Sequence, residues 1–226
     1  MTAPPVHISA NPAHTLAVRL CETLSGLERA AIAVSGGSTP KALFELLAGE
    51  FRARIHWPRV SIFQVDERCV PPDHADSNWR MLKEALLGHV PEATAYRMPA
   101  DEPEGDEAYE ALLLSKVRCN SHGFPVFDVV LLGMGADGHT ASLFPGTAAL
   151  RERERCVVFN DVPQLQTRRM TLTFPVLEAA DRRWFLVSGA DKTEAFARVR
   201  QGELPAGQLA HCAWFIGPEV AGQEED

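Results

Sequence analysis

One short stretch of the sequence carries the groups best suited to acid–base chemistry. Residues 127–146 read FDVVLLGMGADGHTASLFPG, in which an apolar run ends among glycines, Asp137 and His139. The short apolar run, rich in β-branched residues, predicts a strand buried on both faces, and the glycines let the following backbone turn sharply and approach a ligand. A histidine on such a loop can accept and return a proton near neutral pH. We therefore expect catalysis just beyond this strand, with His139 as the proton carrier.

Two other interpretations of this stretch have to be weighed. Gly133, Gly135 and Gly138 match the dinucleotide fingerprint GxGxxG, and Asp161 ends the next apolar run at about the spacing of its acidic residue. Only HTASLF separates the last glycine from the next Pro-Gly pair, whereas a crossover connection in a parallel sheet needs about a dozen residues. A purely packing role for His139 is also disfavoured, because its Gly-Asp-Gly neighbours offer little apolar surface. The catalytic interpretation is therefore favoured over a nicotinamide site.

A candidate phosphate site follows the apolar run 30–34. SGGSTP comes next and leads into the helical pattern KALFELLAGE, with Pro40 suited to the first helical position and Thr39 to the N-cap. The free N–H groups of the helix start, the helix dipole and the hydroxyl groups favour an anion there, although an ordinary capped turn is the alternative. We predict a phosphate cradle formed by Ser35, Gly36, Gly37, Ser38 and Thr39.

Polar side chains also follow the next predicted strand. Asp66, Glu67 and Arg68 follow at the end of the strand-like run RVSIFQVD, and a polar, proline-rich stretch comes after them. Arg68 is suited to bind phosphate, while Asp66 or Glu67 can position it or act as a base; a surface ion pair is the alternative. Ser77 is a good N-cap for the helix that follows and would hold Asn78 near its start.

Lys192 lies just beyond a later apolar run, RWFLV, and opens the helical pattern KTEAFARVRQG. The helix dipole disfavours a lysine in the first turn, so a plain surface lysine is the weaker interpretation. Its ammonium group can reach an anion as a mobile point charge.

Strand-like runs and helical patterns alternate along the whole chain, without an internal repeat or a linker. This order predicts a doubly wound, mostly parallel sheet with helices on both faces, in one α/β domain spanning 1–226. The carboxyl ends of parallel strands share one edge of the sheet. We therefore expect the loops at 35–39, 66–68 and 133–139 to converge there with Lys192.

Composition limits the classes of function. The net charge of −8 argues against nucleic-acid binding, so basic residues near a site would select a small anion. The five cysteines are scattered without a C-x-x-C pair, which predicts reduced thiols and gives no sign of a metal site. The N-terminus lacks the basic and apolar regions of a signal peptide, and no apolar run is long enough to span a membrane. We expect a cytoplasmic protein; its oligomeric state is not predicted.

The chain resembles the 6-phosphogluconolactonase family in five segments, which are SGGSTP at 35–40, DERCVPPDHADSN at 66–78, LLGMGADGHTASLFPG at 131–146, RMTLTFP at 169–175 and SGADK at 188–192. These segments extend over nearly the whole chain. The DGHTASLFPG and DSN segments are specific, whereas SGGSTP is shared with the related glucosamine-6-phosphate deaminases. Those deaminases usually show Asp-Glu-Tyr where Arg68 stands, and Asn-Glu-Pro near Pro145. One departure from the family is Gly217-Pro218, where an acidic residue is common.

The resemblance implies hydrolysis of 6-phospho-D-glucono-1,5-lactone to 6-phosphogluconate in the pentose phosphate pathway, without a metal or an organic cofactor. The fold would be like that of ribose-5-phosphate isomerase and the deaminases. A deaminase or isomerase acting on an amino-sugar phosphate, or a non-catalytic sugar-phosphate-binding protein, are the alternatives.

In this reaction His139 would be the general base for an attacking water, and Asp137 would orient His139 or its loop. Loop N–H groups would stabilise the oxyanion. Arg168 is the alternative to Arg169 as a phosphate-binding residue. The substrate and its phosphate would be bound by the cradle at 35–39 together with Asp66, Arg68, Asn78, Gly135, Arg169 and Lys192.

Overall fold

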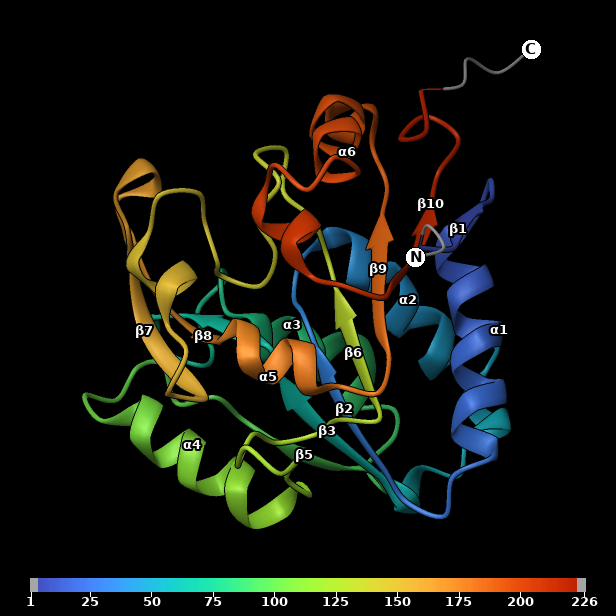
Figure 1. The fold of residues 1–226 in the computed structure, drawn as a ribbon. Helices are drawn as coiled ribbons and strands as arrows, with labels where there is room; N and C mark the ends of the chain where they lie inside the picture. The colour runs from blue at the N-terminus through green and yellow to red at the C-terminus, as the bar shows by residue number, and fades with distance from the viewer. Residues whose placement is uncertain (1–3, 223–226) are drawn as a thin grey trace.

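Seven strands form one parallel sheet in the computed structural model, which describes residues 4–222 (Figure 1). Their order is β1-β10-β9-β6-β2-β3-β5. The chain builds outwards from β2 in both directions, so that the order reverses between β2 and β6, and ligands of open α/β sheets bind at such a point. The strands are β1 (Val6–Ile8), β2 (Ala30–Val34), β3 (Val60–Gln64), β5 (Thr94–Tyr96), β6 (Val129–Leu132), β9 (Arg183–Val187) and β10 (Cys212–Ile216).

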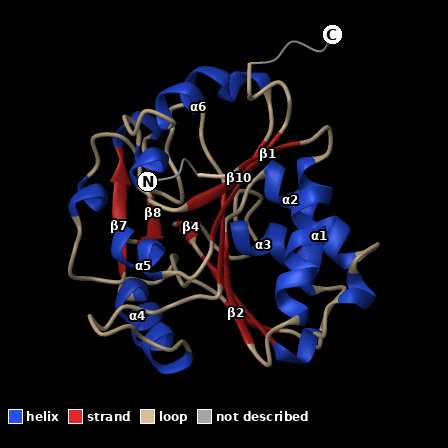
Figure 2. Ribbon diagram, turned by 45° about the vertical axis from the view of Figure 1, so that its right-hand side comes forward, coloured by secondary structure: helices blue, strands red, loops and turns tan. Residues whose placement is uncertain are grey.

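Helices cover both faces of this sheet (Figure 2). On β2, Ile32 and Val34 face one hydrophobic cluster and Ala33 faces the other, because successive strand residues point to opposite sides. The first cluster is completed by α1 (Pro12–Ser25), α2 (Ser38–Ala48) and α3 (Asn78–Leu82), which continues as a π-helix at Lys83–Leu87. The second is completed by α4 (Gly105–Lys116), α5 (Phe174–Ala179) and α6 (Thr193–Val199). The predicted fold class is confirmed.

A second sheet, of three antiparallel strands in the described part of the chain, lies on the α4–α6 side of the main sheet (Figure 2). It consists of β4 (Asp66–Arg68), β8 (Thr167–Leu172) and β7 (Val157–Val162), in that order. The sequence pattern indicated strands near β7 and β8 but placed 66–68 in a loop, because three polar residues show no alternation. The small sheet matters for the site, since it carries two of the predicted basic residues, Arg68 and Arg169.

The helix starts differ in how well they were predicted. Ser77 is the N-cap of α3, as expected, and its hydroxyl accepts a hydrogen bond from the backbone N–H of Arg80. The predicted cap of α2 was wrong by two residues: Gly37, at φ 116°, is the N-cap, and Thr39 lies inside the first turn. Only glycine adopts that conformation without strain. Single 3-10 turns occur at Arg52–Arg54, Trp57–Arg59, Ala148–Arg151, Pro163–Leu165, Ala190–Lys192 and Pro205–Gln208.

Candidate active site

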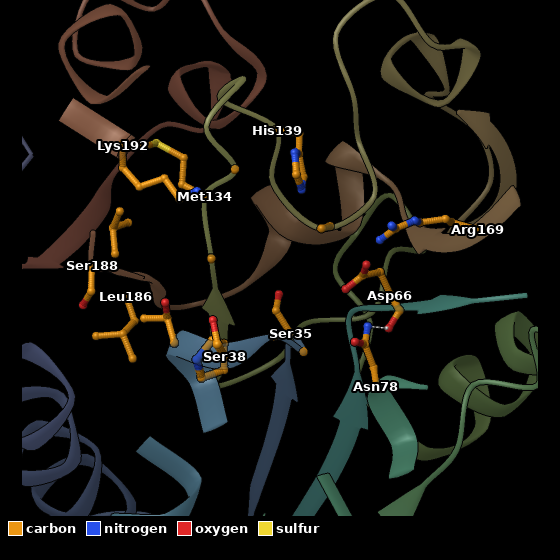
Figure 3. A pocket seen from close by; sticks show the side chains of 18 of the residues that line it. Ser35, Ser38, Asp66, Asn78, Met134, His139, Arg169, Leu186, Ser188 and Lys192 are labelled. Atoms are coloured by element: carbon orange, nitrogen blue, oxygen red, sulfur yellow. Dashed lines mark hydrogen bonds between the residues drawn. The ribbon is translucent and has the colours of Figure 1, made fainter. Parts of the chain in front are cut away.

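A cavity of about 210 Å³ opens beyond the carboxyl ends of β2, β6 and β9 (Figure 3). All the residues predicted for the site line it except Asp137, which lies behind His139. Those lining residues are Ser35, Gly36, Gly37, Ser38, Thr39, Asp66, Arg68, Asn78, Gly135, His139, Arg169 and Lys192. The other lining residues were not predicted to bind substrate, and they are Pro40, Gly133, Met134, Ala141, Leu186, Val187 and Ser188.

The loop after β2 forms the floor of the cavity. The backbone N–H of Ser35 donates to the carbonyl oxygen of Leu131 on β6, while its buried hydroxyl has no hydrogen-bond partner within residues 4–222. Gly36 packs against Asn78, because a Cβ there would lie 2.0 Å from the amide oxygen Oδ1. The N-terminus of α2 follows at once, and its dipole favours an anion. The loop is thus a cradle with a spare hydroxyl group at its edge.

Lys192 lies on one side of the cavity, above the cradle and next to Ser188 (Figure 3). Its Nζ is 2.7 Å from Oδ2 of Asp191. This hydrogen bond and the lysine charge lower the pKa of Asp191. The lysine side chain is 22% exposed and the aspartate 65% exposed, so an anion entering the cavity can replace the aspartate as the partner of the ammonium group.

His139 lies at the top of the cavity, between Lys192 and Arg169 (Figure 3). Its Nδ1 is 2.6 Å from Oδ1 of Asp137, and because a carboxylate only accepts hydrogen bonds, Nδ1 is the protonated nitrogen. The same oxygen accepts the backbone N–H of His139 at 3.1 Å. Nε2 is therefore the atom of the neutral imidazole that can accept a proton.

Two further contacts fix the imidazole plane. The ring stacks on the buried ring of Phe144, with centroids 3.9 Å apart and an angle of 24° between the planes. Gly135 lies against the Nδ1 edge, where a Cβ would come within 2.1 Å of that nitrogen. His139 is therefore held by its face, its edge and its hydrogen bond.

The pKa of Asp137 reflects the same arrangement. Partial burial acts to raise the pKa of this carboxyl group, but its hydrogen bonds and charge interaction with His139 outweigh burial, so the pKa lies below its ordinary value. Asp137 is therefore a carboxylate near neutral pH, able to accept the hydrogen bond from Nδ1–H of His139.

Arg68 and Arg169 lie opposite each other on the antiparallel strands β4 and β8. Arg169 appears at the far side of the cavity from Lys192 (Figure 3). Burial lowers the pKa of Arg169, an effect that Asp66 opposes and Arg68 reinforces. The alternative residue, Arg168, points away: its side chain is 55% exposed, and its guanidinium group lies 4.0 Å over the ring of Phe159.

The two carboxylates of the Asp66-Glu67 pair have different surroundings. Glu67 is 3% exposed and does not line the cavity. It ties the start of α3 to β4, because its oxygens accept hydrogen bonds from Gln64 Nε2, Ser77 Oγ and the backbone N–H groups of Arg68, Asn78 and Trp79. Asp66 lines the cavity, and its Oδ2 accepts a hydrogen bond from Ser142 Oγ at 2.7 Å. Only Asp66 is placed to meet a substrate.

Ser142 joins the histidine loop to the small sheet, and sequence reasoning missed it. Besides its hydroxyl bond to Asp66, its N–H donates to Thr171 Oγ1 at 3.2 Å and its carbonyl oxygen accepts from Asn160 Nδ2 at 2.8 Å. All three partners are buried polar residues. The preceding Ala141 has φ 51°, a left-handed conformation that is strained for alanine, and the bonds of Ser142 hold the turn in place.

The missed lining residues share a signal that the sequence does contain. Met134 follows β6, and Leu186, Val187 and Ser188 lie at the end of β9. Both strands were already expected to end at the site, and the rule that ligands bind beyond the carboxyl ends of parallel strands applies to their uncharged residues as well.

No group of three or more His, Cys, Asp or Glu side chains among residues 4–222 is arranged to hold a metal ion. Within the same range, no helix is both long enough and apolar enough to cross a membrane.

Known proteins with similar sequences and structures point to one family. The family model described as glucosamine-6-phosphate isomerases/6-phosphogluconolactonase matches residues 5–215. A 6-phosphogluconolactonase of Synechocystis is 39% identical over 206 residues, 89% of this chain and 83% of the relative. One of Chlamydia trachomatis is 43% identical over 169 residues, 74% of this chain; the match spans less than two thirds of that relative, 64%.

A solved structure of 6-phosphogluconolactonase from Trypanosoma brucei has the same fold. It superposes with a TM-score of 0.86 at 27% identity and covers 97% of this chain and 98% of its own. The chain belongs to the glucosamine-6-phosphate isomerase/6-phosphogluconolactonase family.

Proposed function

We propose that this protein hydrolyses 6-phospho-D-glucono-1,5-lactone to 6-phosphogluconate. Its relatives at 39% and 43% identity are named 6-phosphogluconolactonase. The observation that carries the proposal is the shared cavity of His139 and the 35–39 loop: an imidazole oriented by a carboxylate faces the same small space as an anion cradle. A phosphorylated ester can place its phosphate in the cradle and its carbonyl group at the imidazole, if the two groups lie within one sugar length of each other.

His139 acts as the general base in this proposal. Nε2 takes a proton from a water molecule whose oxygen forms a bond to C1 of the lactone, and the π electrons of the carbonyl bond move to its oxygen. When the tetrahedral intermediate collapses, the bond between C1 and the ring oxygen breaks, and that oxygen takes the proton from Nε2. The carboxylic acid then releases a proton to solvent. Asp137 holds the imidazole in the tautomer that these proton transfers require.

The 6-phosphate binds in the cradle at 35–39, with Lys192 as its counter-charge. The start of α2 supplies backbone donors and a favourable dipole. The buried hydroxyl of Ser35, which has no hydrogen-bond partner within residues 4–222, can donate to a phosphate oxygen. Binding this remote group orients the carbonyl beneath His139. Arg68 and Arg169 were expected to join this phosphate site, but Arg169 lies across the cavity from Lys192 (Figure 3).

The test is lactone hydrolysis by the purified protein, measured as formation of 6-phosphogluconate above the uncatalysed rate. Replacing His139 with alanine is expected to reduce kcat by about 10²–10⁴-fold, the contribution of general-base catalysis. His122→Ala is the matched control, because this exposed histidine does not line the cavity. Release of ammonia from glucosamine 6-phosphate without lactone turnover would instead support a deaminase, and binding of both compounds without turnover a non-catalytic role.

A further inference from the structure

The positive groups of the cavity form two sets. Lys192 and the cradle lie on one side and Arg169 on the other, with His139 between them (Figure 3). If the proposed function is correct, the lactone carries one anionic group, its phosphate, whereas the product carries two, because hydrolysis creates a carboxylate. When the phosphate occupies the cradle, the substrate has no second anion for the arginine side of the cavity. The product does have one, its carboxylate.

The arginine side of the cavity carries positive charge that forms no ion pair with a carboxylate within residues 4–222, although Arg68 donates a hydrogen bond to the carbonyl oxygen of Asp76. Arg68 and Arg169 are directly opposed across β4 and β8, an arrangement of like charges that destabilises a sheet. Within residues 4–222 the guanidinium group of Arg169 makes no hydrogen bond or ion pair; its Nε is buried, and the group lies over the ring of Phe144, 5.4 Å from the ring centroid. The nearby carboxylate of Asp66, which accepts a hydrogen bond from Ser142, acts on Arg169 through its charge but forms no ion pair with it. The protein thus maintains a partly desolvated positive charge over the same Phe144 ring on which the imidazole of His139 stacks.

We propose that Arg169, assisted by Arg68, receives the negative charge that the reaction creates at C1. When the water oxygen bonds to C1 and its proton passes to Nε2 of His139, the carbonyl oxygen becomes an oxyanion facing the guanidinium group. After the bond from C1 to the ring oxygen breaks and the ring oxygen takes that proton, the carboxylic acid ionises and its carboxylate remains there. A charge that is fixed in advance stabilises such a transition state most effectively, because it needs no reorganisation.

Phosphate recognition and carboxylate recognition can be separated with two ligands. 6-Phosphogluconate carries both groups, while glucitol 6-phosphate carries the same phosphate and a neutral hydroxymethyl group in place of the carboxylate. Isothermal titration calorimetry gives the dissociation constant of each. The wild type is expected to prefer 6-phosphogluconate by about 10- to 100-fold, the range expected for a charged hydrogen bond.

Variants then assign this preference to a residue. Arg169→Met is expected to abolish the preference while leaving the affinity for glucitol 6-phosphate within about threefold, and to lower kcat much more than it changes KM. Lys192→Met is expected to lower the affinity for both ligands by the same factor. Arg168→Met is the matched control, because this neighbour on the same strand lies outside the cavity. Arg169→Lys, which retains the charge without the planar fork, should retain part of the preference and covers the case in which the methionine variant does not fold.

If Arg169→Met lowered the affinity for both ligands by the same factor, the inference would be overturned, and this arginine would belong to the phosphate site. A wild type without preference for 6-phosphogluconate would overturn it as well. Neither result touches the proposed function, which fails separately if the wild type does not accelerate lactone hydrolysis.

Discussion

Gly135 offers the sharpest test of how His139 is positioned. In a Gly135→Ala variant the new Cβ would lie 2.1 Å from Nδ1 of His139, whereas ordinary contacts begin at 3.4 Å. The imidazole must therefore shift by about 1.3 Å, the difference between these distances, and the added atom would also stand 2.7 Å from the Asp137 oxygen that orients the ring. The backbone itself accepts alanine, because Gly135 is not among the residues with positive φ.

A misplacement of about 1 Å between reacting groups costs roughly 10²-fold in rate. We therefore expect Gly135→Ala to lower kcat about 10²-fold, equivalent to about 2.7 kcal/mol of activation free energy. KM should change by less than about threefold, because the cradle at 35–39 and Lys192 are not displaced. Initial rates of lactone hydrolysis over a range of substrate concentrations separate the two constants.

The control is Gly26→Ala at the end of α1, outside the cavity, where a Cβ would make an ordinary contact of 3.6 Å. Thermal unfolding of both variants shows whether the fold is intact. The contrary result is a folded Gly135→Ala variant that turns over the lactone within about threefold of the wild-type rate. In that case the position of His139 would not limit the reaction, and His139 could not be the base.

Three further changes test the surroundings of the base. Asp137→Asn is expected to lower kcat by about 10²-fold or more through loss of the required His139 tautomer. Since the pKa of Asp137 is lowered in the folded protein, its stabilising effect is present near neutral pH and should disappear as the pH falls below about 4, where wild type and variant converge in urea unfolding. Phe144→Leu removes the stacking surface of the imidazole and should cost about 1–2 kcal/mol of unfolding free energy as well as activity, measured by denaturant titration and kinetics. Ser142→Ala leaves a buried oxygen of Asp66 without its donor and should cost about 1–3 kcal/mol, and a change below about 0.5 kcal/mol would mean that water replaces the hydroxyl.

The parallel sheet could be predicted because its signals are local. Each buried strand is a short apolar run, such as Ala30–Val34, and each is followed by a helical period, so the order of elements determines the architecture. The convergence of the site loops follows from the same rule, because it depends only on where parallel strands end. Position 139 and the cradle at 35–39 could therefore be placed on one edge without coordinates.

The small sheet could not be predicted in the same way. Residues 66–68 become a strand because β8 pairs with them from a hundred positions away in the chain, and three polar residues carry no pattern that reveals this. For the same reason the sequence alone could not show whether Arg168 or Arg169 faces the cavity. Neighbouring strand residues point to opposite faces, and only the register of β8 against β4 shows which arginine faces the cavity.

Val65 is the only residue between β3 and β4. It is fully buried; its N–H donates to Val34 of the main sheet, and its carbonyl oxygen accepts from Leu172 of the small one. A single inserted or deleted residue here would turn the side chains of 66–68 to the opposite face. A change of chain length at this junction would therefore move Asp66 and Arg68 away from the cavity, and chimeras with other members of the family should not be joined there.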